Sequence, residues 1–203
     1  MNFSYRLGRR IFREIARGLF DFRVIGEEKL HFPGPALIAC NHVSFLDPPF
    51  VGQAFDEVVH SFARKSLFNH PLMGALLRSW QVLGVDLDKP DTTALKSTIR
   101  LLRSGEKVLI FPEGTRSFDG HLQPAEAGVG LFIAKGQAPV LPVRLFGAYE
   151  AYPRGAKTLR PARITLVIGD LWQPDLTSYS QTGKDLYQVL ADEVMTRIAS
   201  LSL

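Results

Sequence analysis

The sequence predicts a single α/β domain whose mixed, mostly parallel sheet is covered by helices. Short apolar runs alternate with helical patterns along most of the 203 residues, as they do in chains built from strand–helix–strand units. Polar motifs stand where two of the apolar runs end, and sites in open α/β sheets lie at strand ends. The length suits one domain that buries roughly 70% of the surface of its unfolded chain.

Residues 1–22 predict a basic amphipathic helix that precedes a domain formed by residues 23–203. Apolar side chains recur at helical spacing: Phe3, Leu7, Ile11, Ile15, Leu19 and Phe22. Arginines occupy the complementary face: Arg6, Arg9, Arg10, Arg13 and Arg17. Such a helix either lies in the headgroup layer of an anionic membrane or packs its apolar stripe on the domain. The helical pattern alone does not distinguish the two.

The remaining chain predicts alternating elements. Strand-like runs cover residues 35–40, 58–63, 82–87, 107–111, 139–146 and 162–168. Helical patterns cover residues 48–55, 71–80, 92–103, 127–134 and 184–201. The last helix is expected to turn Leu186, Leu190, Val194 and Ile198 inward, and residues 147–161 read as a long surface loop.

The single cysteine, Cys40, excludes an intramolecular disulfide and favours the cytosolic side of a membrane. The N-terminus lacks the continuous apolar core of a signal peptide, and no stretch of about 18 residues is apolar enough to span a bilayer. We therefore expect a chain that does not cross a membrane.

The first polar motif, at residues 41–48, follows the apolar run that ends at Cys40. A histidine, with an ordinary pKa of about 6.5, suits general-base work at neutral pH, and a carboxylate on its other ring nitrogen fixes the tautomer. His42 and Asp47 are the candidates for this pair. Taken alone, a histidine followed by a capping Asp-Pro is more often a structural helix start than a catalytic pair, so the rest of the chain has to decide.

The second polar motif, at residues 111–117, follows the apolar run over 107–111. Gly114 permits a sharp turn that directs Thr115 and Arg116 toward the strand end, where a guanidinium can bind a phosphate with two hydrogen bonds. Glu113 is placed to orient Arg116 or a backbone donor. The alternative is a strand-to-loop turn with a surface Glu–Arg pair, but such a turn does not need so specific a sequence.

The motifs taken together resemble the four ordered blocks of the glycerolipid acyltransferases of the 1-acylglycerol-3-phosphate acyltransferase type. The blocks stand at residues 41–48, 63–68, 111–117 and 139–143, and the resemblance runs from about residue 22 to 146. It implies that His42 deprotonates a lysophospholipid hydroxyl, which attacks the thioester of acyl-CoA or acyl carrier protein, with Asp47 assisting. It implies no metal, no further cofactor and no nucleic-acid partner.

The resemblance also implies binding roles for the other blocks. Arg116 resembles the clamp for the acceptor phosphate, with Glu113, Gly114 and Thr115 shaping it, while Arg64 and Lys65 stand where relatives carry a basic pair. Residues 140–143 resemble an apolar strand near the acyl chain and thioester. A membrane-bound product favours lipid contact for the N-terminal helix, at the cytoplasmic face of the membrane.

Two departures from the family pattern bear on the acceptor. Leu87 stands where relatives often carry a second phosphate-binding arginine, with Lys89 as a poorer replacement, and Glu126 stands where they often carry a lysine. The sequence therefore leaves open another lyso-lipid acceptor.

Three alternatives from other classes also stay open. One is a non-catalytic lipid-surface module, and another is a hydrolase that uses a Cys40–His42 pair. The third is a cation site built on His42, Asp47 and Glu113, although no clustered ligand spacing supports it.

Overall fold

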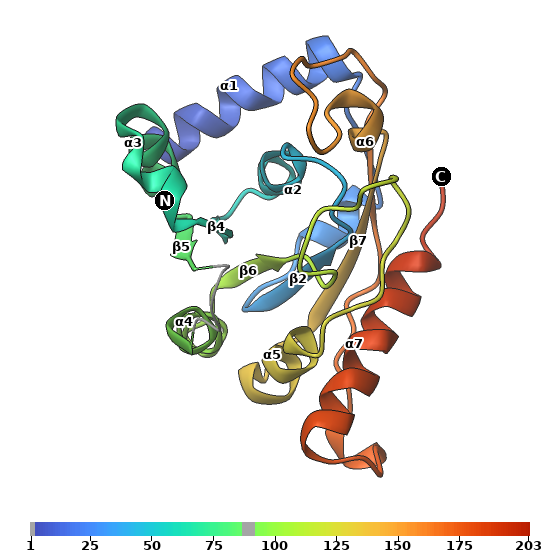
Figure 1. The fold of residues 1–203 in the computed structure, drawn as a ribbon. Coiled ribbons are helices and arrows are strands. Elements are labelled where there is room, and N and C mark those ends of the chain that lie inside the picture. The colour runs from blue at the N-terminus through green and yellow to red at the C-terminus, as the bar shows by residue number, and fades with distance from the viewer. Residues whose placement is uncertain (1–2, 87–91) are drawn as a thin grey trace.

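The computed structural model describes residues 3–86 and 92–203 and confirms the predicted α/β fold (Figure 1). Its main sheet has six strands in the order β1-β8-β7-β2-β6-β3, and only the β7–β8 pair is antiparallel. In that order the strands are Arg23–Ile25, Thr165–Ile168, Val140–Phe146, Ala36–Cys40, Lys107–Ile110 and Val59–His60. The central strand β2 lies between two parallel neighbours, so its C-terminal end shares one sheet edge with theirs.

The predicted strand over residues 58–63 is divided in two. Its first half is β3, which pairs with β6, and its second half is β4 (Phe62–Arg64), which pairs in parallel with β5 (Leu83–Val85) in a separate two-stranded sheet. The prediction of one strand was wrong because each half of the run has a different pairing partner.

Helices cover both faces of the main sheet (Figure 1). The α-helices are α1 (Phe3–Phe20), α2 (Asp47–Ala54), α3 (Pro71–Ser79), α4 (Thr92–Arg103), α5 (Gly128–Gly136), α6 (Ala148–Ala151) and α7 (Gly183–Ala199). Three short 3₁₀ turns are η1 (Glu27–Leu30), η2 (Lys65–Asn69) and η3 (Leu176–Ser178). α6 falls inside the segment predicted as loop, because its buried alanines pack on the core despite the polar residues around them.

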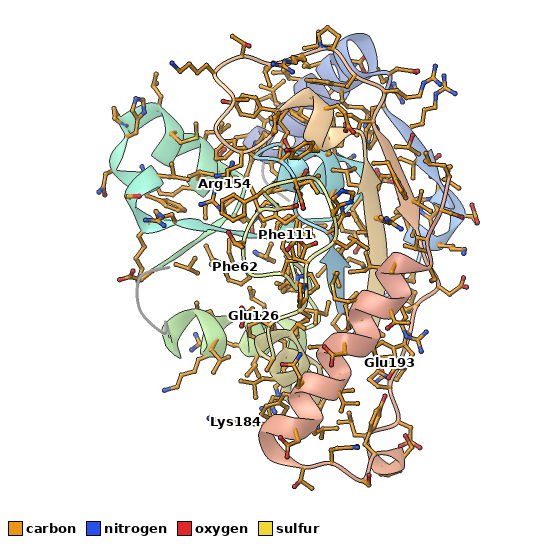
Figure 2. The ribbon with its side chains drawn as sticks, turned by 45° about the vertical axis from the view of Figure 1, so that its right-hand side comes forward. Phe62, Phe111, Glu126, Arg154, Lys184 and Glu193 are labelled. Carbon is orange, nitrogen blue, oxygen red and sulfur yellow. The ribbon has the colours of Figure 1, made fainter. Side chains whose placement is uncertain are left out.

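The side chains of β2 alternate between two hydrophobic cores. Ile38 and Cys40 pack with residues of α1, α2 and α6, whereas Leu37 and Ala39 pack with residues of α5 and α7. Helix α7 buries Leu190, Val194 and Ile198 as predicted, with Leu186 partly buried, and turns Lys184 away from the sheet (Figure 2). The core therefore holds β2 from both sides.

Helix α1 packs on the domain through a face other than its apolar stripe. Tyr5, Ala16 and Phe20 are buried, and the Arg13 guanidinium donates to the Gln53 carbonyl at 2.9 Å. Arg9 likewise binds the Phe55 carbonyl and the Asp56 carboxylate, so these two arginines attach α1 to the C-terminal end of α2.

The apolar stripe of α1 consequently faces outward. Its five side chains keep between 40% and 73% of their surface: Phe3, Leu7, Ile11, Ile15 and Leu19. Phe22, which lies beyond the helix, instead stacks on the Phe50 ring with centroids 5.3 Å apart. The interpretation in which the stripe packs on the domain was therefore wrong. Within residues 3–86 and 92–203, no helix combines the length and apolar composition that crossing a bilayer needs.

Candidate active site

The parallel pairing of β2 with β6 brings the two polar motifs together. Ala39 lies opposite Ile110 in the register, so residues 41–47 and 111–117 leave the sheet side by side. The rings of His42 and Phe111 stack with centroids 3.9 Å apart and an interplanar angle of 15°. The Ser117 amide donates to the His42 carbonyl at 2.7 Å, which ties the two motifs together through their backbones.

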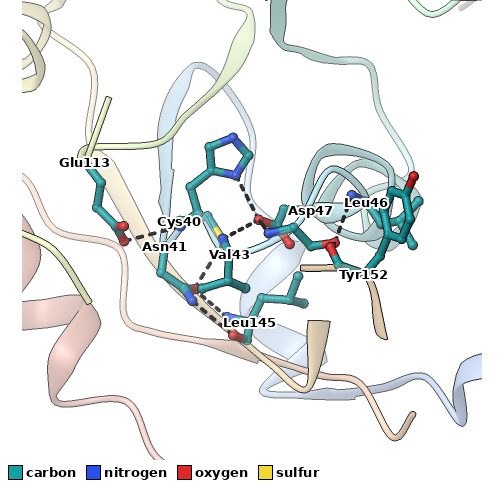
Figure 3. Close-up of polar contacts among 10 residues, drawn as sticks. Cys40, Asn41, Val43, Leu46, Asp47, Glu113, Leu145 and Tyr152 are labelled. Atoms are coloured by element: carbon teal, nitrogen blue, oxygen red, sulfur yellow. Dashed lines mark hydrogen bonds and ion pairs between the residues drawn. The ribbon is translucent and has the colours of Figure 1, made fainter. Parts of the chain in front are cut away.

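His42 and Asp47 form a hydrogen-bonded pair. The His42 Nδ1 lies 2.8 Å from the Asp47 Oδ2, and the aspartate is fully buried at the first turn of α2. The same oxygen accepts the amides of Val43 and Ser44, each at 2.7 Å (Figure 3). Burial raises the pKa of Asp47, and the three hydrogen bonds oppose that rise. A carboxylate on Nδ1 stabilises the tautomer with an unprotonated Nε2, which is the form that a general base requires.

Two further residues hold the His42 loop, and the sequence had assigned no role to either. The buried Asn41 amide donates to the Leu145 carbonyl at 3.0 Å and accepts the Leu145 amide at 2.7 Å (Figure 3). The Ser44 hydroxyl donates to the Tyr152 carbonyl at 2.8 Å. A polar pair in a run that is otherwise buried is the sequence signal for such roles, because buried polar groups need partners.

Glu113 lies behind the His42 loop and is outside the lining of the cavity described below. It is 4% exposed, and its Oε1 accepts the His42 amide at 3.2 Å. The pKa of Glu113 is raised to about 7, and burial of the carboxyl group is the largest cause. Of the two partners predicted for Glu113, Arg116 or a backbone donor, the structure shows the backbone donor, which is the amide of His42.

The turn after Glu113 does reach the surface of the cavity. Gly114 has a φ of 67°, a left-handed conformation that disfavours other residues, and Thr115 and Arg116 follow it in the lining. The Arg116 guanidinium lies 5.9 Å from the centroid of the Phe45 ring. A side chain on Gly114 would come within 3.0 Å of the Glu126 Cγ, so Glu126 lies against this turn. Leu87 and Lys89 lie outside the described residues.

The second and fourth family blocks are only partly at the site. Arg64 lines the cavity, whereas Lys65, at the start of η2, does not. Val140, Leu141 and Val143 are fully buried in β7, outside the cavity lining. Residues 140–143 thus lie in a central strand that is covered on both faces, and their expected position beside the acyl chain stays a prediction.

A largely apolar cavity of about 880 Å³ opens beside His42. Residues of α1, α2, α3 and α4 form its walls: Tyr5, Phe12, Gly52, Gln53, Leu76, Leu77, Ala94, Leu95 and Thr98. Its volume and lining are those of a site for a largely apolar ligand, with a few polar groups among the apolar walls.

The geometry does not favour the thiol hydrolase or the cation site that the sequence left open. Cys40 is fully buried on the face of β2 that packs against α1, α2 and α6. Burial raises the pKa of its thiol well above the usual value. A nucleophilic thiol needs access and a lowered pKa, and Cys40 has neither. Among residues 3–86 and 92–203, no group of three or more His, Cys, Asp or Glu side chains is placed to hold a metal ion.

Comparison with known proteins agrees with this site. A family model described as Acyltransferase matches residues 21–145. The chain is 30% identical over 181 residues to a 1-acyl-sn-glycerol-3-phosphate acyltransferase of Bacillus subtilis (strain 168), and the match covers 88% of this chain and 87% of that one. It is 29% identical over 166 residues to the enzyme of that name from Limnanthes alba, with 77% of this chain but only 59% of the relative covered.

A solved structure has the same fold. The crystal structure of the 1-acyl-sn-glycerophosphate (LPA) acyltransferase PlsC from Thermotoga maritima superposes with a TM-score of 0.73 at 25% identity, covering 98% of this chain and 78% of that one. The relatives are O-acyltransferases, and the chain belongs to this acyltransferase family.

Proposed function

We propose that this protein transfers a fatty acyl group from a thioester to the free hydroxyl of 1-acylglycerol 3-phosphate, forming phosphatidic acid in phospholipid synthesis. The observation that carries the proposal is the His42–Asp47 pair, in which the aspartate is buried and the histidine lines an apolar cavity. The relatives' names supply the acceptor, and the donor is acyl-CoA or acyl carrier protein.

The reaction is a single displacement. The Nε2 of His42 takes the proton of the acceptor hydroxyl as its oxygen attacks the thioester carbonyl carbon, with Asp47 stabilising the imidazolium. The carbon–sulfur bond then breaks, and the leaving thiolate receives the proton from His42. No acyl-enzyme forms. The apolar walls hold the acyl chain, and Arg116 at the cavity surface binds the acceptor phosphate.

Thiol release from palmitoyl-CoA and from palmitoyl carrier protein tests this proposal. Wild type and His42→Ala are compared with lysophosphatidic acid, with lysophosphatidylglycerol and without acceptor. The proposal expects release that needs both His42 and lysophosphatidic acid.

Other outcomes identify the alternatives. Release with lysophosphatidylglycerol alone would move the acceptor to another lyso-lipid, which the position of Glu126 against Gly114 favours. Release without acceptor would indicate a hydrolase, and full activity of Cys40→Ala would exclude a thiol nucleophile there. No release with either donor would favour a lipid-binding module. Chelators are expected to leave the activity unchanged.

We also propose that the protein lies on the anionic, cytoplasmic face of a membrane through the exposed stripe of α1. The stripe has the apolar surface for insertion, while Arg6, Arg10 and Arg17 remain exposed to attract anionic lipid at about 1 kcal/mol per basic residue. Ile11→Ser with Ile15→Ser should weaken sedimentation with anionic vesicles. The matched control Leu171→Ser, at an exposed leucine after β8, should not. Equal binding of both variants would remove α1 as the contact.

A further inference from the structure

Arg154 is one of four arginines that line the active-site cavity, with Arg9, Arg64 and Arg116, and it lies outside the residues matched by the family model. It follows α6, in the segment that joins this helix to β8. Its Nη1 donates to the Thr115 hydroxyl at 3.4 Å, a long hydrogen bond, and its guanidinium carbon lies 4.1 Å from the centroid of the Phe118 ring. Figure 2 shows Arg154 on the same side of the sheet as Phe111.

The backbone before Arg154 is attached to the catalytic loop. Ala148 and Ala151 are fully buried, and the Tyr152 carbonyl accepts the hydroxyl of Ser44, which stands between His42 and Asp47. Gly147 has a φ of 81°, and a side chain there would meet the Arg163 carbonyl oxygen at 1.9 Å. The backbone is therefore held two residues before Arg154. This contact fixes where the Arg154 side chain begins relative to His42.

The charge of Arg154 is not balanced by a neighbouring acid. Among the described residues, neither Arg154 nor Arg116 has a carboxylate at ion-pair distance, in contrast to Arg9 and Arg163. The hydrogen-bond partner of Arg154 is the neutral hydroxyl of the residue next to Arg116. Arg116 and Arg154 both line the apolar cavity, and Thr115 connects them because it precedes Arg116 in the chain and accepts the hydrogen bond from Arg154. A pair of guanidiniums favours a doubly charged anion.

We infer that Arg154 is a specificity-determining residue that binds the acceptor phosphate together with Arg116. The inference rests on the proposed function and deepens it, because two guanidiniums select a phosphomonoester dianion over a phosphodiester that carries one charge.

Steady-state kinetics of Arg154→Gln test the inference. The variant should raise the KM for lysophosphatidic acid at least tenfold, which corresponds to about 1.4 kcal/mol, while kcat falls less than threefold. The Ki of glycerol 3-phosphate as a competitor should rise by a similar factor, and Arg154→Lys should recover part of both. The matched control Arg160→Gln changes an exposed arginine of the same segment outside the cavity lining and should behave as wild type.

The opposing outcomes are distinct. A higher KM for palmitoyl-CoA with an unchanged KM for lysophosphatidic acid would assign Arg154 to a donor phosphate and overturn the inference. Unchanged values for both substrates would do the same and leave the proposed function intact. If wild type fails to acylate lysophosphatidic acid, the proposed function and this inference fall together.

Discussion

The His42 loop and the arginine-bearing cavity surface differ in how they are held. In the loop, the Asp47 carboxylate is fully buried and accepts three hydrogen bonds, and Asn41 fixes the neighbouring backbone to β7. At the cavity surface, Thr115 and Arg154 are exposed and share one long hydrogen bond. The fold thus fixes the proposed catalytic pair through buried hydrogen bonds, whereas the residues proposed to bind the acceptor are held more loosely.

This difference predicts that substitutions separate by kinetic constant. A change in the loop should lower kcat, because the pair acts on the atoms that react. A change at the cavity surface should mainly raise KM, because its cations bind the acceptor in both the ground state and the transition state.

Replacing His42 should have the largest effect. His42→Ala removes the general base and should lower kcat by roughly 10²- to 10⁴-fold, measured as thiol release with lysophosphatidic acid. His31→Gln, at an exposed histidine after η1, is the matched control and should retain full activity. Turnover of His42→Ala within a few-fold of wild type would contradict general-base catalysis by this residue.

Asp47→Asn should follow in size. The amide oxygen can keep the hydrogen bonds from Val43 and Ser44, but the charge that stabilises the imidazolium is lost. We expect kcat to fall by about 10²-fold or more with little change in KM. A circular-dichroism melt shows whether the loop still folds, and a folded variant with normal kcat would make Asp47 a helix-start residue only.

Arg116→Ala should change KM more than kcat. Loss of a guanidinium that binds phosphate should raise the KM for lysophosphatidic acid by about tenfold or more. An unchanged KM would indicate that the acceptor carries no phosphate at this position. It would also contradict the expectation that changes at the cavity surface act on KM.

Glu113→Gln should give the smallest effect, seen in stability. Because the folded-state pKa of Glu113 is raised from 4.5 to about 7, the folded protein binds more protons than the unfolded chain between these values. This residue therefore lowers stability progressively as pH rises from about 4.5 to 7. The Tm of the variant relative to wild type should increase across that window and stay constant above about pH 8. A difference that does not vary with pH would contradict a titrating Glu113.

The parts of the fold that follow local patterns were predictable. The strands β2, β6 and β7 and the helices α4 and α7 lie within a few residues of their expected bounds, because the strands are short continuous apolar runs and the helices repeat apolar residues at helical spacing. The three-residue strand β1 and the four-residue helix α6 were missed, since so few residues give no period to read. The break between β3 and β4 depends on pairing partners that are distant in sequence.

The site divides in the same way. The motifs predicted which residues meet at the ends of β2 and β6, and the structure brings His42 and Asp47 to 2.8 Å. Which backbone donor Glu113 binds, and the approach of Arg154 to Thr115, depend on packing between segments 39 or more residues apart, for which the sequence carries no spacing signal.

Helix α1 is at once a wall of the cavity and the carrier of the exposed stripe, since Tyr5, Arg9 and Phe12 line the space beside His42. Removing residues 1–22 would therefore do more than detach the protein from lipid. The apolar cavity would then be open to bulk water. A thioester bound there could be hydrolysed before its acyl group is transferred. Point substitutions on the outer stripe leave this wall in place. They therefore distinguish the loss of lipid contact from the entry of water into the cavity.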